Sequence, residues 1–496
     1  MKKHCLLLSA ILFIIVLEQS CRDGSRQNSR EYNVVFIVAD ALRCDVLGCY
    51  GGDVATPNID KLAASGTLFE NFYSTGPVTL SSSVAMFTGN YSSFYKVMNT
   101  RKKKVKKFKY SFYVNDDEFL LAEALKKKGF AVFMDLENNI AACSNNLQGF
   151  EKLKNFKEMT NEEIARVEQE IGFVDGGETD IKLITNYHNM FSFLHYLMTV
   201  EENQPFILLK WFLDPHSPYN PAEKFKRKIS VDPTRLPENK DFYSKPASKS
   251  IELASRKRKI LDYEHYYLKE LYKAEVESID ERIGFIVQVL KKRKLLDKTF
   301  FIFTTDHGEL FGEHGQRQHR GFYYQPLIHI PFMISGPGIP KGKRVQTRVS
   351  HLSLMPTLKE LLQVKHTNNM EGTSFKGLLT ARKSNPLLYF DGTPNNRRAN
   401  ISSNALIMDN YKLMKKIENQ TISLTLHNLE TDPDENINIA QNQPKILKKM
   451  VDNLAVFNER IAEKQQLNLS KINKDVNLSK KWQTTKKELK ALGYLD

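Results

Sequence analysis

Three runs of apolar residues in this chain each end at residues that can bind a metal ion or an anion. The runs are NVVFIVA, PFILLKWFL and FFIFTT, and they lead into Asp40, Asp214-Pro215-His216 and Asp306-His307. Unbroken apolar and β-branched residues are typical of strands buried on both faces of a parallel sheet. Segments with helical periodicity lie between them, around residues 116–130, 181–200 and 263–291. This alternation predicts an α/β fold with a mostly parallel central sheet.

The pattern changes from about Leu387 onward. Shorter, alternating strands follow one another (LLYFDG, ALIMDNYKLMKKI and ISLTLHNLE), and the helical segment KILKKMVDNLAVFNERIAEKQ comes after them. Such a texture predicts a small antiparallel α+β subdomain with one packed helix. We therefore expect a catalytic domain at 32–385 and a C-terminal subdomain with a polar tail at 386–496.

The first residues predict export. Lys2 and Lys3 precede a run of apolar residues that is too short to span a bilayer comfortably, as in a secretory signal peptide at residues 1–21. Ser20-Cys21 fits a lipoprotein cleavage site with Cys21 as the lipidated N-terminus, but Glu18 and Gln19 are poor residues before such a site. We expect a periplasmic or cell-envelope protein, with membrane association through a lipidated Cys21 left open.

Charge and cysteine content narrow the classes of partner. The net charge is +15, which in an exported protein favours anionic glycans, lipid headgroups or surface polymers, although a solubilising lysine-rich surface gives the same charge. Export and the absence of a reader motif argue against nucleic acid. Three cysteines remain after the export segment, an odd number that is not a disulfide framework, so Cys44 and Cys49 either pair or stay free thiols.

Candidate metal chemistry lies at the ends of the apolar strands. In open α/β sheets, ligands bind beyond the carboxyl ends of the strands, so Asp40 and Asp306 are expected at one edge. Two carboxylates in a low-dielectric crevice repel each other unless a cation lies between them. His307 follows directly, and His216 lies past another strand at the same edge. The plainer interpretation of Asp306-His307 alone is a solvated loop with capping groups.

A hydroxyl near residue 79 offers two interpretations. The segment TLSSSVAMFTG predicts a helix that stops at Gly89, and Thr79 or a nearby serine would then be its N-cap. The functional interpretation is a nucleophile at the positive end of a helix, where anions bind readily.

Seven segments, in order, resemble the sulfatase family within the alkaline-phosphatase superfamily. They are NVVFIVADALRCDVLGCYG, TPNIDKLAASGTLFENFYS, DPHSPY, FTTDHGELFGEHG, IPFMISGPG, LHNLETDPDENINIA and LKALGYL. Together they cover nearly the whole chain after the export segment. The resemblance implies an alkaline-phosphatase-like fold, a mostly parallel sheet sandwiched by helices.

The resemblance also implies roles for individual residues. Asp40, Asp306 and His307 match the family's metal ligands, and Thr79 matches the catalytic position, which also faces the metal. In formylglycine-dependent sulfatases this position is a cysteine or serine within C/S-x-P-S-R. The run here, TLSSS, lacks that first residue, the proline and the arginine. A threonine resembles the phospho-transfer branch of the superfamily, in which the hydroxyl attacks directly.

Two further departures concern the sulfate-binding half of the site. Ala41 stands where many sulfatases have a second aspartate, and the family's Gly-Lys-Trp-His-Leu-Gly stretch is missing near Met134–Asn139. Fewer ligands and fewer cations leave sulfate and phosphate esters both open.

The sequence thus predicts an exported, metal-dependent, sulfatase-like hydrolase of a sulfate or phosphate ester. We expect one divalent cation, Ca²⁺, Mn²⁺ or Mg²⁺, with Zn²⁺ admitted by His307. Thr79 is the predicted nucleophile; His216 and His319 are predicted to act in catalysis and substrate binding, and His314 in substrate binding.

The expected substrate is a small anionic ester, or a sulfated or phosphorylated glycan or lipid headgroup. Two alternatives stay open. One is a phosphoethanolamine- or phosphoglycerol-type headgroup transferase, although those enzymes usually carry several membrane spans. The other is a non-catalytic protein that keeps the fold and binds a ligand.

Overall fold

The computed structural model describes residues 31–98, 110–172, 181–226, 229, 259–319, 322–365, 369–380, 386–391 and 401–472. The predicted signal peptide with Cys21 and the LKALGYL segment lie outside the described residues. The domain boundaries stay predictions.

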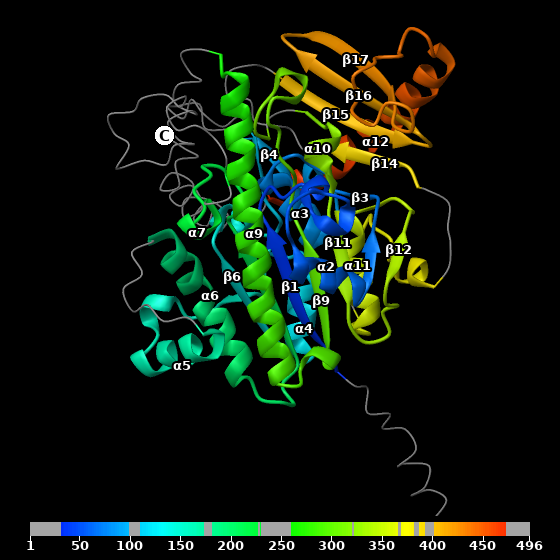
Figure 1. Ribbon diagram of the computed structural model, residues 1–496. Coiled ribbons are helices and arrows are strands. Elements are labelled where there is room, and N and C mark those ends of the chain that lie inside the picture. Colours follow the sequence, from blue (N-terminus) through cyan, green and yellow to red (C-terminus); the bar gives the residue numbers. More distant parts are fainter. Residues whose placement is uncertain are drawn as a thin grey trace, which may run out of the picture.

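An eight-stranded sheet forms the centre of the molecule, in the order β12-β2-β11-β9-β1-β8-β6-β7 (Figure 1). The strands are β1 (Asn33–Ala39), β2 (Thr67–Phe69), β6 (Ala131–Leu136), β7 (Glu151–Lys152), β8 (Phe206–Phe212), β9 (Thr299–Thr304), β11 (Phe332–Ser335) and β12 (Lys343–Val345). β9, β1, β8, β6 and β7 run parallel, and β11 is antiparallel to β9 and β2. The three apolar runs of the sequence are therefore the three adjacent central strands, as predicted.

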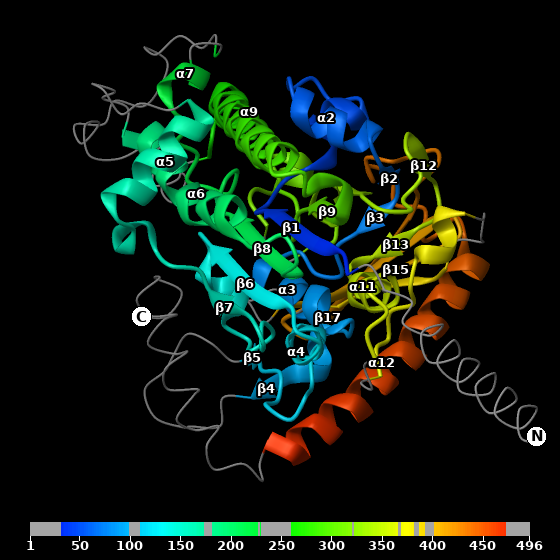
Figure 2. The same ribbon diagram turned by 90° about the horizontal axis from the view of Figure 1, so that it is seen from below.

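Helices cover both faces of the sheet, as Figure 2 shows. One face carries α2 (Pro57–Ala64), α5 (Asn161–Ile171), α6 (Ile181–Thr199) and α9 (Asp262–Lys292), and the other carries α3 (Thr79–Thr88), α4 (Leu121–Lys127) and α11 (Leu354–Leu361). Alternate residues of β1 enter the two cores: Val35 and Ile37 face the first set, Val34 and Phe36 the second. Burial on both faces explains why these strands are apolar throughout.

The helix predicted from residue 116 begins later, at Leu121. Asp116 lies instead in the preceding turn, where its carboxylate accepts hydrogen bonds from Tyr113 Oη and Asn145 Nδ2. Glu123 then closes the first turn by accepting from the backbone N–H of Leu120. Asp116 and Glu123 thus hold the loop that leads into α4.

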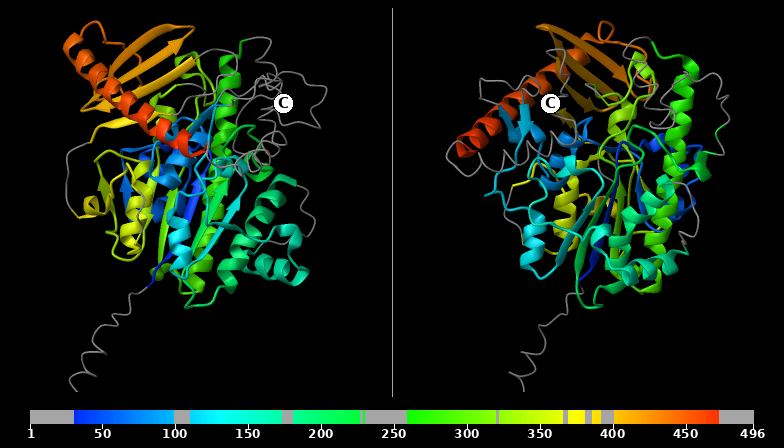
Figure 3. Two further views of the ribbon diagram at one scale, coloured as in Figure 1. Left: turned by 180° about the vertical axis from the view of Figure 1, so that it is seen from behind. Right: turned by 90° about the vertical axis from the view of Figure 1, so that its left-hand side faces the viewer.

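The C-terminal region forms a separate antiparallel sheet of β14 (Leu388–Asp391), β15 (Ile401–Met408), β16 (Tyr411–Glu418) and β17 (Thr421–Asn428). The long helix α12 (Pro444–Ile472) packs against it, as Figure 3 shows. The run ALIMDNYKLMKKI, interpreted above as one strand, is two strands. Asp409, with φ of 51°, turns the chain between β15 and β16, a left-handed conformation that aspartate tolerates.

Smaller elements complete the fold. β3 (Phe72–Tyr73), β10 (His329–Ile330) and β13 (Val349–Ser350) form a short sheet, β4 (Lys96–Met98) pairs with β5 (Tyr110–Phe112), and α7 (Glu223–Lys226) and α10 (Gln325–Ile328) are single turns. Cys44, Cys49 and Cys143 are free thiols. Within the described ranges, every helix is too short or too polar to cross a membrane.

Candidate active site

The ends of β1 and β9 bring three ligand-type side chains together. β1 and β9 run side by side with Val38 paired to Thr304, so Asp40 and Asp306 emerge at the same level of the sheet. His307 Nε2 lies 3.3 Å from Asp306 Oδ2 and 3.9 Å from Asp40 Oδ1. All three side chains are fully buried, which is unusual for ionisable groups without a compensating charge.

The hydrogen bonds of this cluster leave its acceptors facing one another. His307 Nδ1 lies 2.8 Å from the carbonyl oxygen of Gly308, so Nδ1 carries the proton and Nε2 presents a lone pair. Asp40 Oδ1 and Asp306 Oδ2 are buried and accept no hydrogen bond from the described residues. Two carboxylate oxygens and an imidazole lone pair that converge are the donor set of a divalent cation. The residues present therefore fit a metal ion.

The electrostatics show the cost of the cluster without an ion. Burial, followed by the nearby Asp306 carboxylate, raises the pKa of Asp40 to about 8. Burial also lowers the pKa of His307, which keeps its imidazole neutral and able to act as a ligand. A cation would remove the penalty on both carboxylates.

Neighbouring groups orient the non-converging oxygen of each carboxylate. Asp40 Oδ2 accepts hydrogen bonds from Asn138 Nδ2 at 2.6 Å and from Trp211 Nε1 at 3.2 Å. Asp306 Oδ1 accepts one from the backbone N–H of Ala41 at 3.1 Å. Ala41 therefore supports the site through its backbone N–H, which holds Asp306. The backbone of Ala41 is left-handed, with φ of 61°. The resemblance described above places a second aspartate at this position in many sulfatases.

Thr79 lies at the first position of α3, and its side chain faces the cluster. Val78 is the N-cap and no side-chain hydroxyl caps this helix, so the interpretation of Thr79 as an N-cap is wrong. Thr79 Oγ1 lies 3.3 Å from His307 Nε2 and is almost fully buried. The hydroxyl thus combines proximity to the ligand set with the positive end of a helix, where a negatively charged oxygen is stabilised.

A row of histidine rings forms the wall beside the cluster. The ring of His319 lies 4.3 Å from that of His307 and 4.8 Å from that of His216. His319 Nδ1 lies 3.2 Å from Glu309 Oε1, and Tyr219 Oη donates to Glu309 Oε2 at 3.0 Å. Burial raises the pKa of Glu309. The structure therefore brings His216 and His319 together beside the predicted ligands.

The turn that carries His216 is held by buried charges. Arg282 of α9 donates to Asp214 Oδ2 at 2.8 Å, so this aspartate is part of an ion pair. Glu137 accepts from the backbone N–H of Leu213 at 3.1 Å. These contacts fix the exit of β8 and hence the place of His216.

His314 lies apart from this row. Its ring stacks on Tyr324 with centroids 3.7 Å apart. Burial lowers the pKa of His314, and the nearby Glu435 of the C-terminal region opposes that shift. Among the described residues, no ring contact joins His314 to His216, His307 or His319. Its role in substrate binding stays a prediction.

Sequence reasoning missed Asn138 and Trp211, which hold the Asp40 carboxylate. It also missed Glu309, which contacts His319, and Tyr219, which donates to Glu309. Asn138 follows β6 at the same sheet edge, so the rule that selected Asp40 and Asp306 would also have selected it. Trp211 could not be selected in this way, because a tryptophan within an apolar strand is expected to be a core residue.

Comparison with known proteins agrees with the fold. Residues 32–364 match the model of the sulfatase family, and residues 312–461 match the C-terminal model of N-sulphoglucosamine sulphohydrolase. Arylsulfatase K of Xenopus laevis is 25% identical over 91% of this chain and 87% of its own length.

Two solved structures share the architecture. The phosphonate monoester hydrolase of Agrobacterium radiobacter is 20% identical, with a TM-score of 0.64 over 87% of this chain and 96% of its own. BT4656, solved with its substrate D-glucosamine-2-N,6-O-disulfate, is 17% identical, with a TM-score of 0.66 over 87% of this chain and 98% of its own. The fold is therefore alkaline-phosphatase-like, and this chain belongs to the sulfatase family of sulfuric ester hydrolases.

Proposed function

We propose that this protein is a divalent-metal-dependent hydrolase of sulfate esters in which the Thr79 hydroxyl is the nucleophile. The observation that carries the proposal is the position of Thr79 Oγ1, 3.3 Å from the lone-pair nitrogen of His307 and at the N-terminus of α3. A hydroxyl beside converging metal ligands has the surroundings that an activated nucleophile needs.

Asp40, Asp306 and His307 would hold the cation, with Thr79 as its neighbour. A bound Ca²⁺, Mn²⁺ or Mg²⁺, or Zn²⁺ through His307, would lower the pKa of the hydroxyl and polarise a non-bridging oxygen of the ester. Asn138 and Trp211 fix the Asp40 carboxylate, so the ligand geometry is set before the ion arrives.

The chain's own groups then account for the reaction. Thr79 Oγ1 gives its proton to water as it attacks the sulfur, the bond from sulfur to the leaving oxygen breaks, and the sulfuryl group is carried on Thr79. His319 or His216 gives a proton to the leaving oxygen. Glu309, which accepts from Tyr219, orients the His319 ring for this step. Water then attacks the sulfur, the bond from sulfur to Thr79 Oγ1 breaks, hydrogen sulfate leaves, and a proton of that water restores the hydroxyl.

Sulfated glycans are the substrate class we favour. The net charge of +15 would attract polyanionic glycans. The similar protein BT4656 is described with a disulfated glucosamine as its substrate. The charge suits a sugar or a lipid headgroup, so the substrate of the similar protein is what favours a sulfated sugar. We further propose that the protein is exported, because charged residues and then an apolar run stand near its start.

Phosphoryl chemistry is the second candidate, and one observation favours it. The run TLSSS replaces the formylglycine signature, so the attacking group would be an unmodified hydroxyl, as in phospho-transfer relatives. The substrate would then be a phosphodiester or a phosphoethanolamine- or phosphoglycerol-bearing lipid headgroup. A non-catalytic binding protein is the remaining alternative.

A substrate panel with metal added back separates these functions. The purified protein is stripped with a chelator, reloaded with Mn²⁺, Ca²⁺, Mg²⁺ or Zn²⁺, and assayed on 4-nitrophenyl sulfate, sulfated monosaccharides, bis-4-nitrophenyl phosphate and phosphoethanolamine lipids. Metal-restored release of sulfate supports the proposal. Turnover of the phosphorus esters alone would replace it with the second candidate, and metal binding without any turnover would favour the binding protein.

A further inference from the structure

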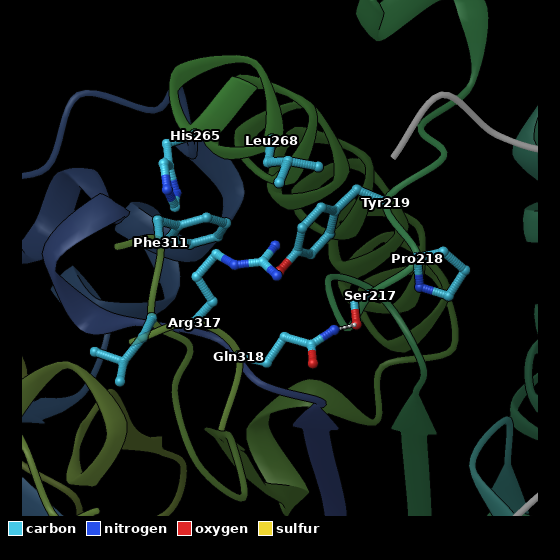
Figure 4. Close-up of a pocket in the computed structure, with 9 residues that line it drawn as sticks. Ser217, Pro218, Tyr219, His265, Leu268, Phe311, Arg317 and Gln318 are labelled. Atoms are coloured by element: carbon cyan, nitrogen blue, oxygen red, sulfur yellow. Dashed lines mark hydrogen bonds between the residues drawn. The ribbon is translucent and has the colours of Figure 1, made fainter. Parts of the chain in front are cut away.

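Two hollows lie near the loops of the candidate active site. Figure 4 shows the smaller one, between α9 and the loop that carries His319. Its volume is about 20 Å³, little more than the roughly 10–15 Å³ that one water molecule needs. This smaller hollow therefore has space for water and for no ligand.

The larger hollow lies where the C-terminal sheet meets the loops of the central sheet. Its volume is about 380 Å³, and it is bounded by the turn after β1, the start of β10 and the loop after β17. Cys44 and His329 line it from the first two segments, and Leu429 and Glu430 from the third. A space of this size holds several water molecules, so a hydrated ion can reach Cys44 and His329 through it.

Cys44 and His329 present two metal-binding atoms to each other. His329 Nε2 lies 2.6 Å from the carbonyl oxygen of Glu70 and donates to it, so Nδ1 carries a lone pair. Nδ1 lies 3.7 Å from Cys44 Sγ. The Cys44 thiol lies closer to the carbonyl oxygen of His329, to which it donates at 3.4 Å. The lone pair on Nδ1 thus stays available beside the sulfur.

The separation of the two atoms matches that of two ligands on one ion. Zn²⁺ binds a thiolate sulfur at about 2.3 Å and an imidazole nitrogen at about 2.0–2.1 Å, which at a tetrahedral angle puts the ligand atoms about 3.6 Å apart. The observed separation is 3.7 Å. A metal-binding histidine also donates its other ring N–H to an oxygen, as His329 does to Glu70. The pair therefore needs hardly any movement to bind an ion.

The pair selects a different kind of ion from the cluster of Asp40, Asp306 and His307. Thiolate and imidazole ligands favour Zn²⁺ and Cu⁺, whereas carboxylates suit Mg²⁺, Ca²⁺ and Mn²⁺. Burial and the nearby Asp45 raise the pKa of Cys44 to about 12, and Arg43 opposes that shift. The thiol is therefore protonated at neutral pH, and an ion that binds must displace its proton.

We propose that Cys44 and His329 form a second metal site, for Zn²⁺ or a similarly thiophilic ion, separate from the cluster at Asp40. On binding, the S–H bond of Cys44 breaks and its proton goes to solvent. The sulfur and His329 Nδ1 bind the ion, and water in the larger hollow completes the coordination. The site does not depend on the proposed sulfatase activity.

Cobalt spectroscopy of the full chain tests the site. The chelator-stripped protein is titrated with Co²⁺, which takes the place of Zn²⁺ and gives a thiolate-to-cobalt charge-transfer band in the near ultraviolet. The wild type should show this band, and added Zn²⁺ should abolish it by displacement. Cys44→Ser should lose it. His329→Gln, which keeps a donor for Glu70, should need at least about tenfold more Co²⁺, since even the groups that only orient a ligand contribute about 10–100-fold.

Cys143→Ser is the matched control, because Cys143 is also a buried cysteine and its Sγ lies 3.5 Å from the carbonyl oxygen of Asn139. This variant should keep the wild-type band. Asp306→Asn should keep it too, although it removes a ligand of the other cluster.

The wild-type spectrum alone can overturn the site. A wild type without the band, a Cys44→Ser variant that keeps it, or a His329→Gln variant with wild-type affinity for Co²⁺ makes the pair a packing contact only. Loss of the band in Asp306→Asn would overturn the separation of the two sites. None of these results bears on the sulfatase proposal, which is judged by metal-restored release of sulfate.

Discussion

Asn138 Nδ2 donates a hydrogen bond of 2.6 Å to Asp40 Oδ2, which leaves Asp40 Oδ1 directed at Asp306 and His307. Groups that orient metal ligands in this way contribute about 10–100-fold to metal affinity. We therefore expect Asn138→Ala to weaken metal binding by roughly that factor, since the carboxylate would lose its fixed rotamer. Calorimetric titration of the chelator-stripped wild type and variant with Mn²⁺ measures the two dissociation constants.

The neighbouring Asn139 provides the control, because its side chain is exposed while Asn138 is buried. Asn139→Ala should bind Mn²⁺ as the wild type does. Equal affinity of the two variants would remove Asn138 from the support of the site.

Removal of the metal should change the pH dependence of stability. Without an ion, burial and Asp306 raise the pKa of Asp40 to about 8. The folded state therefore holds a proton on Asp40 that the unfolded chain has already lost. The stability from this proton is fully present below the ordinary pKa of an aspartate and is lost as the pH rises through 8. Mn²⁺ removes this loss. The increase in thermal midpoint on adding Mn²⁺ should therefore become larger between pH 6 and 9. At a Mn²⁺ concentration of 100 times the dissociation constant, the free energy of unfolding should rise by about 3 kcal/mol.

Asp306→Asn tests the cause of that effect. The metal-free variant should be more stable than the metal-free wild type at pH 8, because the repulsion on Asp40 is gone. Differential scanning calorimetry compares them. An Asp306→Asn variant that is no more stable than the wild type at pH 8, both without metal, would contradict the repulsion between the two carboxylates.

One rule let the sequence group three candidate metal ligands before their geometry was known. Parallel buried strands end at one edge, so Asp40, Asp306 and His307 could be grouped from their places after apolar runs. Distances between rings could not be predicted in that way. His314 and His319 are five residues apart, yet His319 lies against His307 and His314 stacks on Tyr324. His314 has a left-handed backbone with φ of 54°, and it turns the loop at this point.

His319→Asn should distinguish proton donation from simple binding. A general acid contributes about 10²–10⁴-fold when the leaving oxygen is basic. Hydrolysis of an alkyl or sugar sulfate should fall by that order, and hydrolysis of 4-nitrophenyl sulfate much less, because 4-nitrophenolate leaves without a proton. The ratio of kcat values on the two substrates is the readout.

His188 serves as the histidine control for that experiment, since it stacks on Phe156 at the face of α6. His188→Asn should leave both rates within about twofold. Equal losses on both esters in His319→Asn would instead assign His319 to binding the transferred group.

His351 should make the fold sensitive to acid. Its ring is fully buried, Nε2 donates to the carbonyl oxygen of Thr305 at 2.9 Å, and burial lowers its pKa to about 4. A lowered histidine pKa means that the unfolded state binds the extra proton between pH 6.5 and 4, so stability falls as the pH falls through that window, by up to about 3 kcal/mol.

His351→Gln should flatten this part of the stability curve, because glutamine can donate to Thr305 and does not titrate. Urea unfolding from pH 4 to 7 measures the difference. A variant whose stability falls with pH as steeply as that of the wild type would assign the acid sensitivity to other groups.

The nucleophile tests the central claim most directly, because the hydroxyl of Thr79 is the one group that the proposal cannot replace. Single-turnover and steady-state sulfate release are measured for Thr79→Ala and Thr79→Ser, with Ser83→Ala, one turn further along α3, as the control. We predict a loss of about 10³-fold or more in kcat for Thr79→Ala, substantial activity in Thr79→Ser, and little change in Ser83→Ala. Metal-dependent sulfate release by Thr79→Ala at a rate close to that of the wild type would contradict the account.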